Sequence, residues 1–422
     1  MEPVQAADAA RGSSTVRSVL RRTTAALLAG GVLVLATACG PDDTKASGSG
    51  SSGGGSGSSS APGTPGSAAS PKVSAAQLSV DPKDGATDVA PNGALKVSVA
   101  DGKLTQVTVA DKNGTAVQGS IAADGSSWSP SGPLSVGTVY QVTAQAVDAS
   151  GQQAALNSSF TTLTPGKTVA INDNITTGST YGVGMIVSVN FTKDITNKAD
   201  VLKGITFEAS DGSQLKGHWF GNRRVDFRPQ AFWKSGTTVK VHYKLKSTEV
   251  ASGVYGLDRD ESFTIGRSQI STADASTDKM TVVRDGQTIE TLPITAGNDQ
   301  NPSYNGTMVI KEKDPTTRMN SATVANVVGG EYDVPDVPHA MRLTDSGTYV
   351  HGNYWSSAFG VSNASHGCIG LQDAKGGDNN SVAGKFYNSS LIGDVVIIKG
   401  AKGKTVSGDN GWSGWTIPWA SW

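Results

Sequence analysis

The sequence predicts a mainly β protein with several domains. Short runs that alternate apolar and polar residues recur at residues 95–99, 186–191 and 239–243, and this period is typical of half-buried strands. No segment between residues 73 and 266 sustains the spacing of an amphipathic helix. The chain has 422 residues and 52 glycines, a length that allows several domains, each with its own apolar core.

The first two folded units form an internal repeat, which predicts two sandwiches of the same type. Each unit ends on a similar strand, at residues 160–162 and 263–265, so we place the units at residues 73–164 and 168–266. Strands of this length and spacing predict immunoglobulin-like β-sandwiches, here without a disulfide. The repeat pairs Trp128, Pro130, Leu134, Gly137, Thr138, Tyr140 and Val142 with Phe227, Pro229, Trp233, Gly236, Thr237, Val239 and Val241, in that order.

The N-terminus indicates export. Four arginines precede an apolar stretch at residues 23–38, which is too short to span a bilayer comfortably. The stretch ends in LATACG, which resembles a bacterial lipobox with Cys39 as the lipidated residue. We therefore expect a lipoprotein signal peptide at residues 1–39 and an exported protein, anchored to the cell membrane by lipid and facing the cell wall. Ordinary signal cleavage near Ala38, without a lipid, is the alternative.

Residues 40–72 predict a flexible tether. They consist almost entirely of Gly, Ser, Ala, Pro and Thr, with few apolar residues larger than alanine that could anchor a core. Fully stretched, such a segment reaches roughly 100 Å. The net charge of −1 and the lack of a basic run interleaved with aromatic residues argue against a nucleic-acid partner.

Scarce reactive residues gather in one window near the C-terminus. The chain has five histidines and two cysteines, yet His339, His351, His366 and Cys368 fall within thirty residues. A thiolate attacks carbonyl groups, and a nearby imidazole can take the thiol proton and return it to a leaving amine. Gly367 lets the backbone turn sharply beside the sulfur, so that N–H groups can face a developing oxyanion. The pattern predicts acyl transfer through Cys368.

Two other interpretations of this cluster stay open. Cys368 can be a buried structural residue beside incidental histidines. A His/His/Cys set can also hold zinc, but catalytic zinc needs three placed ligands and usually a supporting carboxylate, and His351–Leu371 contains neither Asp nor Glu. Because Cys39 lies at a processing site, no cysteine is left to form a disulfide with Cys368.

One bacterial enzyme family carries a similar motif. The sequence SHGC at residues 365–368, preceded by HG at residues 351–352, resembles the active-site motif of the L,D-transpeptidases of bacterial cell walls. The sequences YNGTMVI at residues 304–310 and AMRL at residues 340–343 are similar to two of the family's strands. The resemblance implies a mostly β L,D-transpeptidase catalytic domain at residues 268–400, after one or two immunoglobulin-like domains.

The resemblance also implies roles for the residues of the motif. Cys368 would be the nucleophile and His351 the general base and acid. The backbone carbonyl of Gly352 would orient that base, and His366 and Gly367 would form the oxyanion region. No metal and no organic cofactor are implied.

Substrate contacts follow from the same resemblance. Residues 317–339 are expected to form a flap over the site, although a plain surface loop is the alternative. The substrate-binding residues implied are Tyr332, Met319, Ser346, Gly347 and Gly370. Because the family usually has asparagine at the position of Gly370, one side-chain contact to the substrate is missing or replaced in this chain.

Within the catalytic region the pattern predicts strands and one short helix. Residues 279–283 and 287–291 flank Arg-Asp-Gly, a hairpin signal, and residues 394–398 form a buried-strand run. A short helix is expected near residues 381–387. Residues 401–422 form a Trp-rich extension with Trp412, Trp415, Trp419 and Trp422.

These aromatic residues need a covering surface. The family resemblance implies that the extension packs back on the catalytic domain, and binding of carbohydrate or a partner is the alternative. In the sandwiches, Trp128, Trp219 and Trp233 could bind wall polymer, but aromatic residues at strand positions are more often part of a core, so we expect spacer domains.

The implied function is peptidoglycan cross-linking. The cysteine would form a thioester with one stem peptide, and an amine of a second stem would resolve it to a 3→3 cross-link. Carbapenem-type β-lactams are implied as inhibitors that acylate the cysteine. The alternatives are an L,D-carboxypeptidase, in which water resolves the thioester, a transferase that attaches a protein to the wall, and a non-catalytic wall-binding scaffold.

Overall fold

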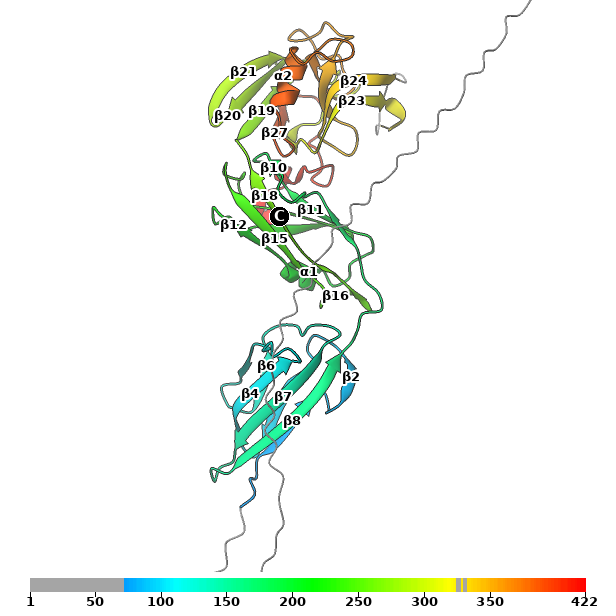
Figure 1. The fold of residues 1–422 in the computed structure, drawn as a ribbon. Helices are drawn as coiled ribbons and strands as arrows, with labels where there is room; N and C mark the ends of the chain where they lie inside the picture. Colours follow the sequence, from blue (N-terminus) through cyan, green and yellow to red (C-terminus); the bar gives the residue numbers. More distant parts are fainter. Residues whose placement is uncertain (1–71, 324–327, 329–331) are drawn as a thin grey trace, which may run out of the picture. The chain divides into compact units, whose positions relative to one another are not determined.

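The computed structural model describes residues 72–323, 328 and 332–422 (Figure 1). The expected signal peptide, Cys39 and nearly all of the expected tether lie outside the described residues. In the described part of the chain, no helix is both long and apolar enough to cross a membrane.

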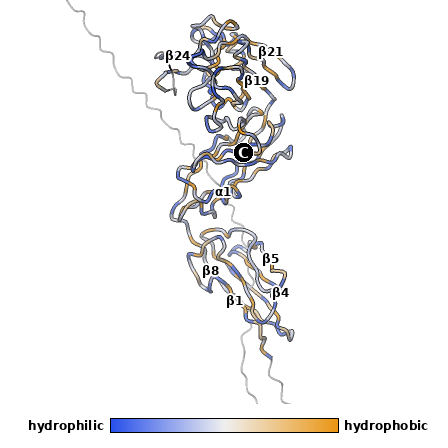
Figure 2. Tube along the Cα trace, turned by 180° about the vertical axis from the view of Figure 1, so that it is seen from behind, coloured by the Kyte–Doolittle hydropathy of each residue, from blue (hydrophilic) through white to orange (hydrophobic). Residues whose placement is uncertain are grey.

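The first sandwich consists of two four-stranded sheets with strand orders β1-β3-β6-β5 and β2-β8-β7-β4. Hydrophilic and hydrophobic residues alternate in short stretches along its strands (Figure 2), and its cluster of buried apolar residues runs from Ala76 to Phe160. The strands are β1 (Gln77–Asp81), β2 (Ala86–Val89), β3 (Lys96–Ala100), β4 (Lys103–Asp111), β5 (Gly119–Ile121), β6 (Ser127–Pro130), β7 (Val139–Val147) and β8 (Gln153–Thr162).

The second sandwich has sheets of order β13-β14-β11-β9 and β10-β18-β15-β12, and β16 and β17 form a small ribbon. The expectation that no helix lies before residue 266 is wrong, because one short helix, α1 (Lys198–Gly204), is present. Its seven residues are too few to show a helical period, and Val201 is its one buried residue. The strands are β9 (Ile171–Asp173), β10 (Thr180–Tyr181), β11 (Val187–Phe191), β12 (Ile205–Ala209), β13 (Lys216–Phe220), β14 (Arg224–Arg228), β15 (Thr238–Lys244), β16 (Glu249–Ala251), β17 (Val254–Tyr255) and β18 (Asp258–Ile265).

The repeat positions form the cores of both sandwiches. Trp128 of β6 and Phe227 of β14 are both buried, as are Leu134 and Trp233 in the following turns. Trp219 is only partly buried and stacks on Phe191, with ring centroids 5.8 Å apart. Trp128 and Trp233 are therefore core residues of the two sandwiches, as expected.

The catalytic region combines a five-stranded sheet of order β21-β20-β19-β27-β22 with a four-stranded sheet of order β23-β24-β25-β26. The expected hairpin is present between β20 and β21, and the expected helix is α2 (Val382–Ser389), capped by the Ser381 side chain on Gly384 N. The strands are β19 (Gln269–Asp274), β20 (Lys279–Arg284), β21 (Gln287–Pro293), β22 (Gly306–Val309), β23 (Glu312–Asn320), β24 (Asp333–Arg342), β25 (Tyr349–Asn353), β26 (Ile369–Gln372) and β27 (Val395–Lys399).

The segment expected as a flap belongs largely to a hairpin. β23 and β24 pair antiparallel from Glu312↔Arg342 to Asn320↔Asp333, with a one-turn 3-10 helix (Ser321–Thr323) after β23. The ladder shifts its register between Thr317 and Met319, which explains why the alternation of apolar residues is hard to see in the sequence. The described residues of this segment are therefore mostly extended strand, and residues 324–327 and 329–331 of the expected flap lie outside the described residues.

The second sandwich and the catalytic region share one apolar core. Val309 of β22 and Val395 of β27 belong to the same buried cluster as Tyr181, Phe227 and the other core residues of the sandwich. Backbone hydrogen bonds from Gly182 N to Ile392 O and from Gly184 N to Gly393 O, both 2.8 Å, join the two regions. Arg267 and the buried Asp394 add a two-pronged ion pair, with both nitrogen–oxygen distances 2.8 Å.

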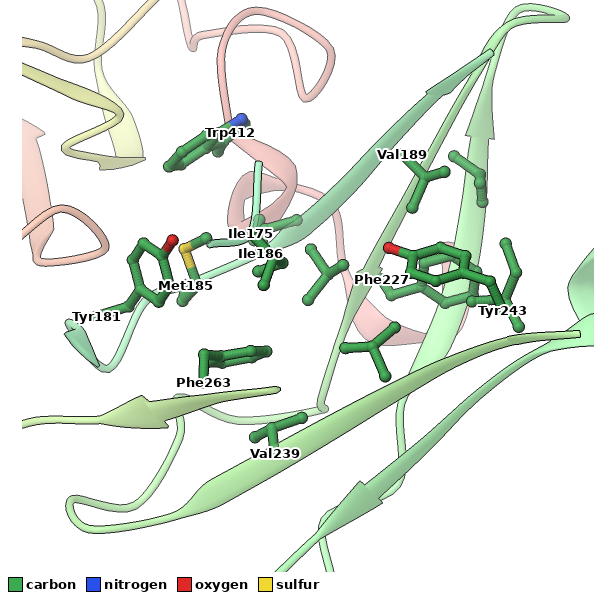
Figure 3. Close-up of a cluster of buried hydrophobic side chains, with 14 of the residues drawn as sticks. Ile175, Tyr181, Met185, Ile186, Val189, Phe227, Val239, Tyr243, Phe263 and Trp412 are labelled. Atoms are coloured by element: carbon green, nitrogen blue, oxygen red, sulfur yellow. The ribbon is translucent and has the colours of Figure 1, made fainter. Parts of the chain in front are cut away.

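The C-terminal extension packs on both regions. As expected, its first part packs on the catalytic domain, where Val406 belongs to the apolar core and its N–H donates to Asn305 O (2.8 Å). Its tryptophans, however, pack on the second sandwich. Figure 3 shows Trp412 facing the same apolar cluster as Tyr181 and Met185. The indole N–H of Trp415 donates to Gly184 O (2.8 Å) and that of Trp422 to Lys216 O (2.7 Å). Two 3-10 turns complete the extension, η2 (Gly414–Thr416) and η3 (Trp419–Ser421).

Arg228 explains why the tail lies there. This buried arginine projects from β14, and its guanidinium lies 4.4–5.2 Å from the ring centroids of Trp415, Trp419 and Trp422. Its Nη2 donates to Ile417 O (2.7 Å). Burial lowers the pKa of Arg228 to about 10, so the side chain stays charged at neutral pH and attracts the aromatic faces.

Candidate active site

Two neighbouring parallel strands bring the reactive residues together. β25 carries His351, and β26 begins directly after Cys368, with His351 paired to Gly370 across the ladder. Both side chains line one cavity of about 340 Å³. The other residues that line it include Met319, Tyr332, Asn353, Trp355, Ser365 and His366.

His351 is held as a neutral base. The side chain is 4% exposed, and its Nδ1 donates to the backbone carbonyl of Gly352 at 2.8 Å. A proton on Nδ1 leaves Nε2 with a free lone pair. Burial lowers the pKa of His351 below 6.5, and the bond to Gly352 opposes this shift. Trp355 stacks on the ring, with centroids 5.8 Å apart.

Cys368 is a buried thiol that lines the same cavity as His351. It is 8% exposed, and its Sγ donates to Gly347 O at 3.6 Å. Burial raises the pKa of Cys368 to about 11, although the backbone N–H of Tyr349 favours the thiolate. At neutral pH both side chains are therefore uncharged.

Ser365 braces the loop that holds the sulfur. Its hydroxyl donates to the backbone carbonyl of Cys368 (2.6 Å) and accepts from Gly367 N (3.2 Å). Gly367 has φ +111, a conformation that side chains rarely adopt, so glycine is required there. The ring of His366 packs on Tyr332, with centroids 4.9 Å apart, and both residues line the cavity that contains Cys368.

Gly370, one of the five implied substrate-binding residues, lies on β26 opposite His351, and the other four fall into two groups. Met319 and Tyr332 form a wall of the cavity, and burial raises the pKa of Tyr332 to about 12, so its hydroxyl stays protonated. Ser346 and Gly347 lie in the turn before β25. There Ser346 N donates to Asn410 Oδ1 (3.0 Å), and Asn410 Nδ2 donates to Ser346 Oγ (2.8 Å).

Three residues near the site were missed in the sequence analysis. Asn353 and Trp355 line the cavity, and their position two and four residues after His351 was the available signal. Asp373 accepts from His339 Nδ1 at 2.7 Å, and its Oδ2 lies 2.1 Å from where a side chain on Gly352 would begin. This close packing requires glycine at position 352, next to the base.

His339 has a structural place outside the cavity. It adopts φ +47, which is unusual for a residue with a side chain, and it is held by Asp373 and, at 3.3 Å, by Asn379 Oδ1. Across the described ranges, no group of three or more His, Cys, Asp or Glu side chains is arranged to hold a metal ion.

Comparisons with known proteins agree with this geometry. A family model for the bacterial Ig domain matches residues 86–249, and one for the L,D-transpeptidase catalytic domain matches residues 268–398. L,D-transpeptidase 2 of Mycobacterium tuberculosis is 31% identical over 349 residues, or 82% of this chain and 84% of that protein. L,D-transpeptidase 5 of the same species is 29% identical over 357 residues, or 82% of this chain and 76% of that protein.

A solved structure gives a more local match. L,D-transpeptidase 3 from Mycobacterium tuberculosis, in complex with a faropenem-derived adduct, is 26% identical and has a TM-score of 0.44, covering 56% of this chain and all of that one. The full-length relatives decide the assignment, because 31% identity extends over more than four fifths of both chains. The protein therefore belongs to the L,D-transpeptidase family.

Proposed function

We propose that this protein joins peptidoglycan stem peptides by 3→3 cross-links, with Cys368 as nucleophile and His351 as general base and acid. The observation that carries the assignment is the shared cavity, in which a neutral imidazole with a fixed tautomer accompanies a buried thiol. Membership of the family supplies the substrate class.

These two side chains account for the covalent bond and the proton transfers of the proposed reaction. The Cys368 sulfur attacks the carbonyl carbon of the L-centre in a diamino-acid–D-alanine bond, and the thiol proton passes to His351. The ring returns that proton to the departing amine, so the C–N bond breaks, D-alanine leaves and a thioester remains. A side-chain amine of a second stem then attacks the thioester, and its proton restores the thiol through His351.

Groups around the pair would assist the reaction. The Gly352 carbonyl would hold His351 in the reactive tautomer and stabilise the imidazolium as it forms. Gly367 N already donates to Ser365. We therefore propose that the N–H of Cys368 is the main hydrogen-bond donor to the oxyanion, in the region formed by His366, Gly367 and Cys368. Met319 and Tyr332 would contact the acyl donor, and the turn at Ser346–Gly347 would border it.

Mass spectrometry and product analysis test the nucleophile. Incubation with a carbapenem should add the mass of one inhibitor, and peptide mapping should place it on Cys368. Cys368→Ser should show neither the adduct nor cross-linked muropeptides. Undiminished joining by this variant would overturn the proposal, and a folded wild-type protein that forms no adduct would favour the scaffold.

The same product analysis separates the other acceptors. Cross-linked dimers from tetrapeptide stems support the transpeptidase. Shortened stems without dimers would indicate a carboxypeptidase, and a wall-linked protein would indicate the attachment reaction.

The pH profile of acylation tests the base. The rate constant for acylation by a carbapenem should fall as the pH drops through the lowered pKa of His351, because the protonated ring cannot accept the thiol proton. The rate should stay level from that pKa to above pH 7, because the pKa of Cys368 is raised to about 11. A rate that instead rises through pH 8–9 would indicate a free thiolate and contradict the proposed base.

We also propose an exported protein anchored to the membrane through a lipid on Cys39. Only the sequence of residues 1–72 supports this localisation. Cell fractionation should find the wild type in the membrane and Cys39→Ala released from it, and metabolic labelling with a fatty acid should mark only the wild type. Equal fractionation and labelling would contradict the anchor.

A further inference from the structure

Gly370 leaves a gap that a neighbouring strand fills. The family usually carries an asparagine side chain at this position, and glycine has none. A Cβ built on Gly370 would lie 3.2 Å from Asn353 Nδ2 and 3.4 Å from Asn353 Cβ. It would also lie 2.9 Å from Thr295 Cγ2, so a side chain at position 370 would force Thr295 to shift and Asn353 to move slightly.

Hydrogen bonds fix the orientation of the Asn353 amide. Its Oδ1 accepts from the backbone N–H groups of Trp355 and Ser356, both at 3.1 Å. Since only the oxygen of an amide can accept, Nδ2 must be the atom beside Gly370. Among the described residues, no acceptor lies within hydrogen-bond distance of Nδ2. Asn353 as a whole is only 4% exposed, but Nδ2 is not among the fully buried atoms that lack a partner, so it keeps an accessible surface.

The strand geometry places this amide on the same face of β25 as His351. Asn353 lies two residues after His351 on β25, and alternate residues of a strand point to the same face. Both residues line the cavity that contains Cys368. An amide N–H that borders this cavity and has no acceptor within the protein is free to donate to a bound molecule.

We propose that Asn353 takes over, from the adjacent strand, the substrate contact that Gly370 lacks. Its Nδ2 donates to a carbonyl or carboxylate oxygen of the acyl-donor stem peptide and helps to set the peptide in register with Cys368. Asn353 is therefore a substrate-binding residue, and this inference rests on the proposed transpeptidase function.

Asn353→Asp is the sharpest test. Aspartate keeps the oxygen that accepts from Trp355 and Ser356 but removes the N–H donor, so the loop should stay folded. We expect kcat/KM for a tetrapeptide donor to fall about tenfold or more, the loss of one hydrogen bond to a substrate. Thermal unfolding should stay close to that of the wild type.

A small thiol reagent separates substrate binding from an effect on the sulfur. Alkylation of Cys368 by iodoacetamide needs no contact with the amide, so its rate should change less than twofold in Asn353→Asp. A parallel fall in alkylation and peptide turnover would overturn the inference, because the carboxylate would then act through the pKa of the thiol.

Moving the amide back provides the rescue. The triple variant Thr295→Ser/Asn353→Ala/Gly370→Asn places a side-chain amide on β26 and removes the Thr295 methyl group that this side chain would meet, while keeping the hydroxyl. It should regain at least half of the kcat/KM lost in Thr295→Ser/Asn353→Ala. Gly370→Asn alone should not raise turnover, because its side chain meets Thr295 and Asn353. Wild-type kcat/KM in Asn353→Asp would refute the role of Asn353 alone, whereas undiminished joining by Cys368→Ser would refute the transpeptidase mechanism.

Discussion

The two sandwiches share a repeat but differ in what their cores contact. All members of the first core cluster come from residues 76–160. The second cluster also contains Val309 and Val395 of the catalytic sheet and Trp412 of the C-terminal extension. The second sandwich is therefore part of the catalytic scaffold, whereas the first has the features of a separable spacer.

The difference also connects the second sandwich to the reactive thiol. Arg224 of β14 donates to the backbone carbonyls of Asp409 and Gly411 in the extension. Between these two residues, Asn410 holds Ser346, and the next residue, Gly347, accepts from the Cys368 thiol. A sandwich can thus influence catalysis by bracing a turn, without contacting the substrate.

Deletion of residues 405–422 should have the largest effect. The loss of Trp412, Trp415 and Trp422 removes three buried or half-buried aromatic side chains, each of which contributes about 3–5 kcal/mol, and the sum approaches the whole stability of a typical domain. We expect the second sandwich and the catalytic region to lose cooperative unfolding in circular dichroism. Deletion of residues 72–164 is the matched control, and it should leave their unfolding temperature unchanged. If both deletions lowered the stability of the catalytic region equally, the proposed difference between the two sandwiches would be wrong.

Arg228→Ala should have the second-largest effect on stability. It removes three cation–aromatic contacts and a hydrogen bond to the tail, for an expected loss of about 4 kcal/mol in the free energy of unfolding. The repeat places the exposed Ser129 of β6 at the equivalent position of the first sandwich, and Ser129→Ala should change this free energy by less than about 0.5 kcal/mol. Urea unfolding of both variants measures the difference.

Gly182→Ala should disrupt the packing between the second sandwich and the catalytic sheet. The added Cβ would lie 2.3 Å from Asp394 N, which is backbone and cannot turn aside, so we expect a loss of about 2–3 kcal/mol. Gly132 of the first sandwich has open space around it and an ordinary φ, which makes Gly132→Ala a matched control. An unchanged unfolding temperature of Gly182→Ala in calorimetry would argue against close packing between the second sandwich and the catalytic sheet.

Asn410→Ala should have the smallest effect on stability and a measurable one on turnover. Its two hydrogen bonds to Ser346 are worth about 1–2 kcal/mol together, and their loss frees the turn that carries Gly347. We expect acylation by a carbapenem to slow severalfold while the unfolding temperature falls by only a few degrees. Unchanged acylation would show that the extension stabilises the fold without bracing the site.

Local patterns in the sequence were sufficient for most of the strands and for the reactive pair. Alternation of apolar residues located strands such as β11 and β15, and the short helix expected near residues 381–387 is α2. The rarity of His and Cys drew attention to His351 and Cys368, which the parallel pairing of β25 with β26 then brings into one cavity.

Other features had no local signal. Helix α1 is shorter than two helical repeats, and a register shift in the β23–β24 hairpin hid its alternation. The role of Asn353 depends on the absence of a side chain at Gly370 across the ladder, which becomes visible only when the strands are paired.

What the sequence alone determined was therefore the kind of chemistry, the order of the domains and the residues that make each core, because these depend on neighbours along the chain. The tertiary structure decided which sandwich merges with the catalytic region and where the tryptophan tail lies. Both depend on contacts between distant residues, such as Arg228 with Ile417 and Gly182 with Ile392. Those contacts form only where the packed surfaces fit, and surface fit is not encoded by periodicity or composition.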